Sequence, residues 1–167
     1  MRILVAEDLA LSARILQSQL AAWGYEPVVV RDGREAWATL ERPDAPRLAL
    51  LDWEMPLLEG PEVCRRVRVQ AQTPYIYTIL LTGRQREDDI GAGLDAGADD
   101  YVTKPFDAED LRNRLRAVRR LVEIEGELLR MRQDLRAQAN VDAIAGAKNR
   151  RALAVALELA PESERWR

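Results

Sequence analysis

Short apolar runs alternate with amphipathic stretches along roughly the first 120 residues of the chain. The apolar runs predict strands at about 2–7, 25–30, 47–51, 75–81 and 99–103. Helical spacing between them predicts helices at about 9–23, 34–41 and 86–96. A further helix is expected with Pro61 in its first turn, and a last one with Asp107 as its N-cap. Because strands and helices alternate with short connections, the pattern predicts an α/β fold with a doubly wound, five-stranded parallel sheet.

The last predicted helix is unusually long. From Asp107 to about Asn140 the chain has no proline and a single glycine, Gly126, which allows a helix of about 50 Å. Its first part places Leu111, Leu115 and Val118 on one face, which we assign to the domain core.

Further along, the same helix carries a second apolar stripe. Its members are spaced 3, 4, 3, 4 and are Leu121, Ile124, Leu128, Met131 and Leu135. Such spacing is typical of a coiled-coil seam, and a single helix would leave all five side chains in water. The stripe therefore favours a parallel homodimer through this helix; a single solvated helix lying on its own domain is the alternative.

Beyond Asn140 the pattern changes again. The stretch 141–151 indicates a turn at Gly146, and Leu153 and Leu157 then share one side of a short predicted helix at about 150–160, which Pro161 would end. This segment is too small to bury a core of its own.

Composition narrows the class of protein. The chain has 167 residues, a net charge of −3, no histidine and one cysteine, Cys64. The charge balance gives nucleic-acid binding little support, no apolar run is long enough to span a bilayer, and the start has no signal-peptide layout. Without histidine there can be no histidine metal site or phosphohistidine. We expect a cytoplasmic protein without nucleic-acid or membrane partners.

Polar residues stand where the predicted strands end. Glu7 and Asp8 follow the first strand and Asp52 the third, and these carboxylates would meet at one sheet edge if the two strands are neighbours. A magnesium ion would relieve their mutual repulsion, because it prefers oxygen ligands. We expect direct ligation by Asp8 and Asp52, a contact of Glu7 through water, and the backbone carbonyl of Glu54 as a third protein ligand.

The same edge has the parts of a phosphoryl acceptor. A carboxylate oxygen of Asp52 could attack a phosphoryl group to give an aspartyl phosphate. Lys104, after the fifth strand, would supply a second cation, Thr82 a hydroxyl donor, and Gly83 an open approach. Singly, each residue is more often a cap or a solvated surface group; together, at the ends of the right strands, they indicate a site.

With these residues in place, the chain over about residues 1–122 resembles the receiver domain of two-component response regulators. The resemblance rests on Glu7-Asp8, Asp52, Met55-Pro56, Gly60, Thr82-Gly83, the stretch 93–101 and Lys104-Pro105-Phe106. It implies a flavodoxin-like receiver fold in which Asp52 takes phosphate from a sensor histidine kinase, with Mg²⁺ as cofactor. It also implies that Thr82 and Tyr101 form a switch pair and that the Lys104–Pro105 peptide bond is cis.

The end of the chain is similar to the opening of GGDEF diguanylate cyclase domains. The fitting residues are Asp142, Gly146, Asn149, Arg150 and Arg151, whereas Ile144, Ala145 and Ala147 depart from the pattern. The GGDEF segment itself is missing, so we expect no cyclase activity and no enzyme function beyond self-phosphorylation and its reversal. The expected organisation is a receiver at 1–122, a coiled-coil linker at 123–140 and a partial GGDEF-like segment at 141–167.

Two alternatives remain open from the sequence. The chain could be a constitutive coiled-coil dimerisation module whose acidic pocket is vestigial, in which case a phosphoryl mimic would leave its assembly unchanged. It could also be a magnesium-dependent phosphatase, which would need an aspartate two residues after the nucleophile, where this chain has Glu54.

Overall fold

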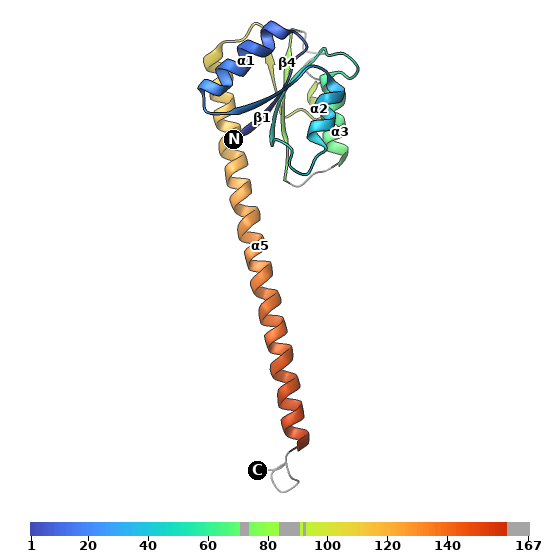
Figure 1. The fold of residues 1–167 in the computed structure, drawn as a ribbon, viewed down its shortest axis with the longest axis vertical. Coiled ribbons are helices and arrows are strands. Elements are labelled where there is room, and N and C mark those ends of the chain that lie inside the picture. Colours follow the sequence, from blue (N-terminus) through green and yellow to red (C-terminus); the bar gives the residue numbers. More distant parts are fainter. Residues whose placement is uncertain (71–73, 84–90, 92, 160–167) are drawn as a thin grey trace. The chain divides into compact units, whose positions relative to one another are not determined.

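The computed structural model describes residues 1–70, 74–83, 91 and 93–159, with side chains up to Arg136. Two compact units are present, Met1–Glu123 and Ile124–Arg167. The first is built on a five-stranded parallel sheet with the order β2-β1-β3-β4-β5 (Figure 1). The strands are β1 Arg2–Ala6, β2 Glu26–Val30, β3 Leu48–Asp52, β4 Tyr77–Thr82 and β5 Asp100–Thr103. The predicted doubly wound parallel sheet is thus confirmed, and its strands lie within two residues of their expected bounds.

One face of the sheet is covered by α1 (Ala10–Ala22) and the start of α5 (Ala108–Leu159). Side chains alternate across a strand, so odd-numbered β1 residues such as Ile3 and Val5 point to this face. They pack with Leu16 and Leu20 of α1 and with Leu111 and Leu115 of α5, and Val118 and Trp23 lie partly buried against this cluster. Ile15, which shares their helical spacing, is 50% exposed, because Ala13 takes the inward place.

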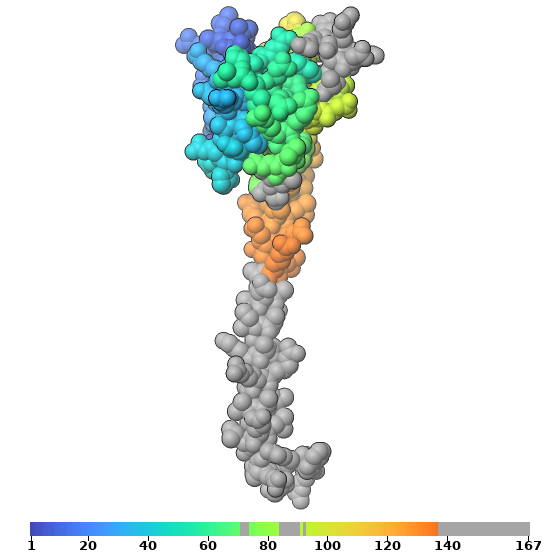
Figure 2. All heavy atoms as spheres, turned by 90° about the vertical axis from the view of Figure 1, so that its right-hand side faces the viewer, coloured from blue at the N-terminus to red at the C-terminus, as the bar shows by residue number. Residues whose placement is uncertain are grey.

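The opposite face is covered by α2 (Gly33–Leu40) and α3 (Gly60–Gln70), which lie side by side in Figures 1 and 2. Leu4, Leu51 and Leu80 of the strands pack here against helix residues. Those contributed by the helices are Ala36, Leu40, Val63, Cys64 and Val67. Helices therefore cover both faces of the sheet and exclude water from them, as the uninterrupted apolar strands predicted.

The helix α5 begins where the sequence indicated but does not end there. The Asp107 side chain accepts a hydrogen bond from the Glu109 backbone at 2.6 Å, which is a cap of the expected kind. The helix then continues through Asn140 and Gly146 to Leu159, so the predicted turn at Gly146 and separate helix at 150–160 are wrong. A lone glycine costs a helix only about 1 kcal/mol, and the alanines around it favour the helix.

Part of the prediction falls on residues outside those described. Of the helix expected at about 86–96, the structure describes residues 91 and 93–96, of which 91 and 93–95 are helical and 96 lies in a turn. The helix end expected at Pro161 also lies outside the described residues. None of the described helices combines the length and hydropathy needed to cross a membrane.

The predicted seam residues of α5 are exposed in the single chain. Leu121, Ile124, Leu128, Met131 and Leu135 have exposed fractions between 49% and 66%. Five large apolar side chains along one stripe of a helix, all open to solvent, form an unpartnered surface. Whether a second helix covers it stays a prediction.

Candidate functional site

Four strand ends surround one cleft. Asp8 lies just after β1, Asp52 ends β3, Thr82 ends β4 and Lys104 follows β5. Since β1, β3, β4 and β5 are successive neighbours in the sheet, these residues meet at its carboxyl edge. They line a cleft of about 460 Å³ together with Leu9, Trp53, Glu54 and Gly83. The structure therefore brings together the side chains that the sequence analysis placed at this edge.

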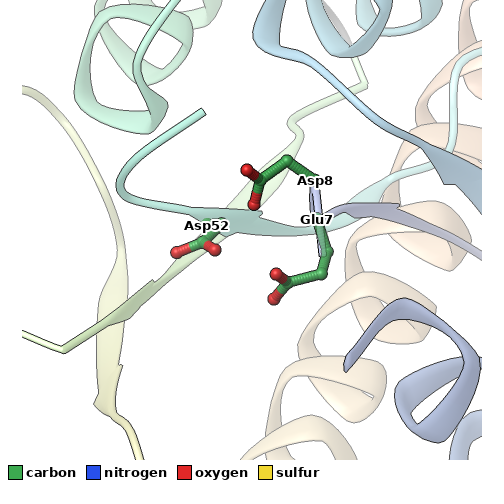
Figure 3. A group of neighbouring side chains, drawn as sticks. All are labelled: Glu7, Asp8 and Asp52. Carbon is green, nitrogen blue, oxygen red and sulfur yellow. The ribbon is translucent and has the colours of Figure 1, made fainter. Parts of the chain in front are cut away.

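Two carboxylates of this cleft, those of Asp8 and Asp52, lie beside a third, that of Glu7 (Figure 3). Glu7, Asp8 and Asp52 each offer an oxygen, and these oxygens lie within 4.8 Å of one another. Glu7 is fully buried, Asp52 is 8% exposed and Asp8 is half-buried. A set of closely spaced hard oxygen ligands fits Mg²⁺, which binds few carboxylates and keeps part of its water. The donor chemistry therefore suits this ion.

Lys104 contacts two members of this acidic group directly. Its Nζ donates to Glu7 Oε2 at 2.6 Å and to Asp52 Oδ2 at 2.8 Å. Burial opposes the charge of Lys104, but the hydrogen bonds to Asp52 and Glu7 outweigh it and raise the lysine pKa. Burial, reinforced by the charge of Asp52, raises the pKa of Glu7 although Lys104 acts against this. The ammonium group thus compensates two of the three carboxylates.

The loop after Asp52 is held in place by backbone contacts. The Trp53 amide donates to Leu81 at 2.8 Å, and the Gly60 amide donates to the Trp53 carbonyl at 3.0 Å. A Cβ at Gly60 would lie 2.3 Å from the Asp52 carbonyl oxygen, so the close approach of α3 to the site requires glycine. In the sequence Gly60 stands out only as part of a motif, because the close approach of α3 that requires a glycine leaves no local signal.

The remaining predicted site residues lie as follows. Thr82 is 1% exposed, and its carbonyl accepts a 2.7 Å hydrogen bond from the Lys104 amide. A Cβ at Gly83 would meet nothing within 4 Å, so this side of the cleft is open. Tyr101 is half-buried against the core cluster on the face of the sheet that α2 and α3 cover, which we call the α2/α3 core cluster. It does not line the cleft. The Lys104–Pro105 bond is cis, as the resemblance implied.

Leu9 is a cleft residue that the sequence reasoning missed. It is 60% exposed at the rim, and its amide donates to Glu7 Oε1 at 3.3 Å. An isolated apolar residue at the start of a helix carries no chemical signal. Only its position directly after the acidic pair could have pointed to it.

Comparison with known proteins gives the family. The family model described as the response regulator receiver domain matches residues 3–116. The sensory transduction protein RegX3 of Mycolicibacterium smegmatis is 42% identical over 118 residues, which cover 71% of this chain and 50% of that protein. The transcriptional regulator ycf27 of Porphyridium aerugineum is 39% identical over 122 residues, covering 73% and 49%.

Solved structures agree with this. The receiver domain of the Francisella response regulator 1452 has a TM-score of 0.63 at 29% identity, covering 74% of this chain and 94% of that one. The receiver domain of the sensor histidine kinase PA1611 from Pseudomonas aeruginosa PAO1, solved with a magnesium ion coordinated in its active-site cleft, has a TM-score of 0.63 at 30% identity, covering 73% and 97%.

The chain belongs to the response regulator receiver domain family, on the family match over residues 3–116 and the fold and cleft described above. It spans about half the length of the curated relatives named here.

Proposed function

We propose that Asp52 is a phosphoryl acceptor that takes its phosphoryl group from a sensor histidine kinase. The observation that carries this is the 2.8 Å contact between Lys104 Nζ and Asp52 Oδ2, inside a cleft that Asp52 itself lines. In the reaction an Asp52 oxygen forms a bond to phosphorus while the bond from phosphorus to the donor breaks. The donor leaves with the electron pair, and Lys104 can shift to an oxygen of the transferred group.

Magnesium is the cofactor that we propose for this site. Asp8, Asp52 and the carbonyl of Glu54 would hold it, and Glu7 would act on it through water. When bound, the ion neutralises charge on the phosphoryl oxygens. The cluster of Glu7, Asp8 and Asp52 supports this, as does the magnesium ion in the cleft of the PA1611 receiver domain.

Thr82 and Tyr101 are the proposed switch residues. Thr82 ends β4, the strand next to β3, and lines the same cleft as Asp52, which supports a role for its hydroxyl as a donor to the phosphoryl group. Tyr101 stands on the neighbouring strand, opposite Leu80 in the β4–β5 register. Movement of Thr82 toward the phosphoryl group would give the Tyr101 ring room to turn inward, which is a two-state element biased by a local charge.

The output surface that we propose is the exposed stripe on α5, paired with the same stripe of a second copy. If Leu121, Leu128 and Leu135 take the a positions of the heptad, then Arg120 and Glu127 are g positions and Glu125 and Arg132 are e positions. In a parallel in-register dimer, g residues face the e residues five positions further along the other helix. The two pairs are then Arg120 with Glu125 and Glu127 with Arg132, both of opposite charge, which supports the parallel arrangement.

A diguanylate cyclase is the output that we propose for the longer architecture. The support is the resemblance of Asp142, Gly146, Asn149, Arg150 and Arg151 to the opening of such domains. A change of helix packing at the receiver would then reach the cyclase through α5. The test is cyclic di-GMP synthesis by a fusion of this chain to a complete cyclase domain, compared before and after phosphorylation.

Acid-quenched mass spectrometry tests the acceptor directly. With Mg²⁺ and acetyl phosphate, the chain should gain about 80 Da, and alkali should remove the addition, as expected of an acyl phosphate. Asp52→Asn should abolish the gain, whereas Asp95→Asn, at an exposed carboxylate outside the cleft, should leave it intact. An unmodified wild-type chain under these conditions would refute the acceptor proposal.

Light scattering with and without beryllofluoride tests the coupling to assembly. We expect the phosphoryl mimic to change either the mass or the dissociation constant of the dimer. An identical assembly in both states would favour the constitutive dimerisation module instead. Leu135→Cys tests the orientation: parallel in-register helices place the two cysteines together, so an intermolecular disulfide should form under mild oxidation, and an antiparallel pair would not form it.

A further inference from the structure

A second hollow lies at the opposite edge of the sheet from the acidic cleft. Tyr25 immediately precedes β2, so it stands at the amino edge of the strands, whereas Asp52 stands at their carboxyl edge. The hollow has a volume of about 400 Å³. It is lined by Trp23, Tyr25, Arg112, Arg116, Arg119, Arg120 and Glu123, all within the Met1–Glu123 unit.

The charges around this hollow are strongly unbalanced. Four arginines face a single carboxylate, Glu123, which already accepts a 2.9 Å hydrogen bond from Arg119. Among the described side chains, no carboxylate lies within ion-pair distance of Arg112, Arg116 or Arg120. The chain as a whole is acidic, with a net charge of −3, so this concentration of arginine does not follow from composition.

A buried polar group without a partner lies against the same arginines. Tyr25 is 5% exposed, and its hydroxyl has no hydrogen-bond partner. The Arg119 guanidinium stands 5.8 Å from the centre of the Tyr25 ring. Buried hydroxyl groups are nearly always hydrogen-bonded, so this unpaired hydroxyl is a candidate donor to a ligand. Burial raises the Tyr25 pKa, which keeps the hydroxyl a donor at neutral pH.

Exposed arginines on a helix are usually solvated and bind nothing. Here, however, they are spaced 4, 3 and 1 along α5, which places them on one side of the helix around a hollow rather than on a flat surface. The hollow has the size of a small-molecule site. Its guanidinium groups offer many hydrogen-bond donors, and its one carboxylate, Glu123, is already bonded to Arg119. This favours an anion with many acceptor oxygens as the ligand.

We propose that this hollow binds a phosphate-bearing small molecule, held by Arg112, Arg116 and Arg119 with the Tyr25 hydroxyl beneath them. A guanidinium binds phosphate oxygens in pairs, and a terminal phosphate has enough oxygens to engage several guanidinium groups at once. A single carboxylate has only two oxygens, so an acidic protein segment would have to place several carboxylates around the same guanidinium groups to use these donors. Its lining shares no residue with the acidic cleft around Asp52.

Metal-free pyrophosphate is the probe, followed by ¹H–¹⁵N NMR of the tryptophan indoles in the full chain. Trp23 lines the basic hollow and Trp53 the acidic cleft, so the two signals report on the two sites separately. We expect saturable movement of the Trp23 signal, with Trp53 unchanged in the presence of EDTA. Movement of Trp53 alone would assign the anion to the acidic cleft and overturn the proposal.

Variants distinguish specific binding in the hollow from non-specific electrostatic attraction. Arg112→Gln with Arg116→Gln should weaken pyrophosphate binding about tenfold or more, and Tyr25→Phe several-fold, as for lost charge-assisted bonds. Arg34→Gln, at an exposed arginine of α2 outside the hollow, is the charge-matched control and should have no effect. Equal losses in the control and in the hollow would overturn the proposal.

A glutamate-rich hexapeptide is the competing probe. Tight binding of this peptide at Trp23, with no response to pyrophosphate, would assign the surface to an acidic protein partner and overturn the proposal. No response of Trp23 to either probe would also overturn it. Circular dichroism of each variant checks that the fold is retained, since Tyr25 is part of the core.

Discussion

Lys104 and Asp52 are joined by a direct hydrogen bond of 2.8 Å, although 52 positions separate them in the chain. The same ammonium group also donates to Glu7. A divalent cation bound by these carboxylates would therefore compete with Lys104 for their oxygens. Lys104 stabilises the acidic group through these two hydrogen bonds, and a bound metal would take over part of that contact.

Lys104→Met should consequently tighten Mg²⁺ binding while it weakens the metal-free fold. Removing the ammonium group leaves Glu7 and Asp52 facing one another without compensation. We expect a loss of about 1–3 kcal/mol in the free energy of unfolding, between the values for exposed and buried ion pairs. Urea unfolding with and without Mg²⁺, and Trp53 fluorescence during Mg²⁺ titration, measure the two effects.

The control for this variant is Arg42→Met, at an exposed cation paired with Asp44 before β3. It should change neither Mg²⁺ affinity nor the response to the metal. Weaker Mg²⁺ binding in Lys104→Met would contradict the competition described above.

Gly60→Ala should destabilise the fold where Gly83→Ala does not. A Cβ at Gly60 would lie 2.3 Å from the Asp52 carbonyl oxygen and 2.9 Å from Leu80, whereas one at Gly83 meets nothing within 4 Å. We expect a loss of about 1–3 kcal/mol for Gly60→Ala, as for an overpacked core, and less than about 0.5 kcal/mol for Gly83→Ala. Thermal or urea unfolding checks both, and equal losses would refute the packing argument.

The sheet and the cleft were open to prediction because their signals are local. An apolar run followed by a carboxylate, as at Asp52, specifies both a buried strand and a polar group at its end. Parallel strands then place all such ends at one edge, so Lys104 could be placed near Asp52 without any contact being known. The 2.6 Å bond from Lys104 to Glu7 could not be foreseen, because it depends on side-chain positions that spacing does not encode.

Other features escaped prediction for different physical reasons. The helix α5 passes through Gly146 because neighbouring alanines outweigh one unfavourable residue. Ile15 and Ala13 both fit helical spacing, and only packing decides which one turns inward. The basic hollow needs Tyr25 and Arg116 to meet although they are distant in the sequence, so the arginines alone suggest an ordinary solvated helix face.

Cys64 should be unreactive in the folded chain. It is fully buried in the α2/α3 core cluster, and burial raises its thiol pKa to about 11. Since the thiolate is the reactive form, a disulfide reagent should modify Cys64 only as fast as the domain opens. The rate of colour release from such a reagent, native against denatured, measures this. Rapid stoichiometric reaction of the native chain would contradict the burial.

Stability should fall at alkaline pH because of Tyr75. Its hydroxyl donates to Asp99, and burial, with this hydrogen bond and the charge of Asp99, raises its pKa from 10.0 to about 12. The folded chain therefore holds this proton more tightly than the unfolded chain. The stabilisation is complete below pH 10.0 and is lost as the pH rises through about 12.

Urea unfolding at several pH values measures this loss of stability at alkaline pH. Tyr75→Phe should reduce this loss of stability, although part of it remains because the pKa values of Cys64 and Tyr25 are raised as well. An unchanged alkaline slope in Tyr75→Phe would show that another group is responsible.

Replacing a leucine of α5 by alanine should affect either the stability of the domain or its dimerisation, depending on where the leucine lies. Leu115 is fully buried against the sheet, whereas Leu128 is 61% exposed on the proposed seam. Leu115→Ala should lower the free energy of unfolding by about 2–5 kcal/mol, as for other buried leucines. Leu128→Ala should leave a dilute monomer almost unchanged and should raise the dimer dissociation constant about tenfold or more. Urea unfolding measures the stability, and sedimentation at several protein concentrations measures the association. If Leu128→Ala lowers the stability of the monomer without weakening association, the seam has no partner helix.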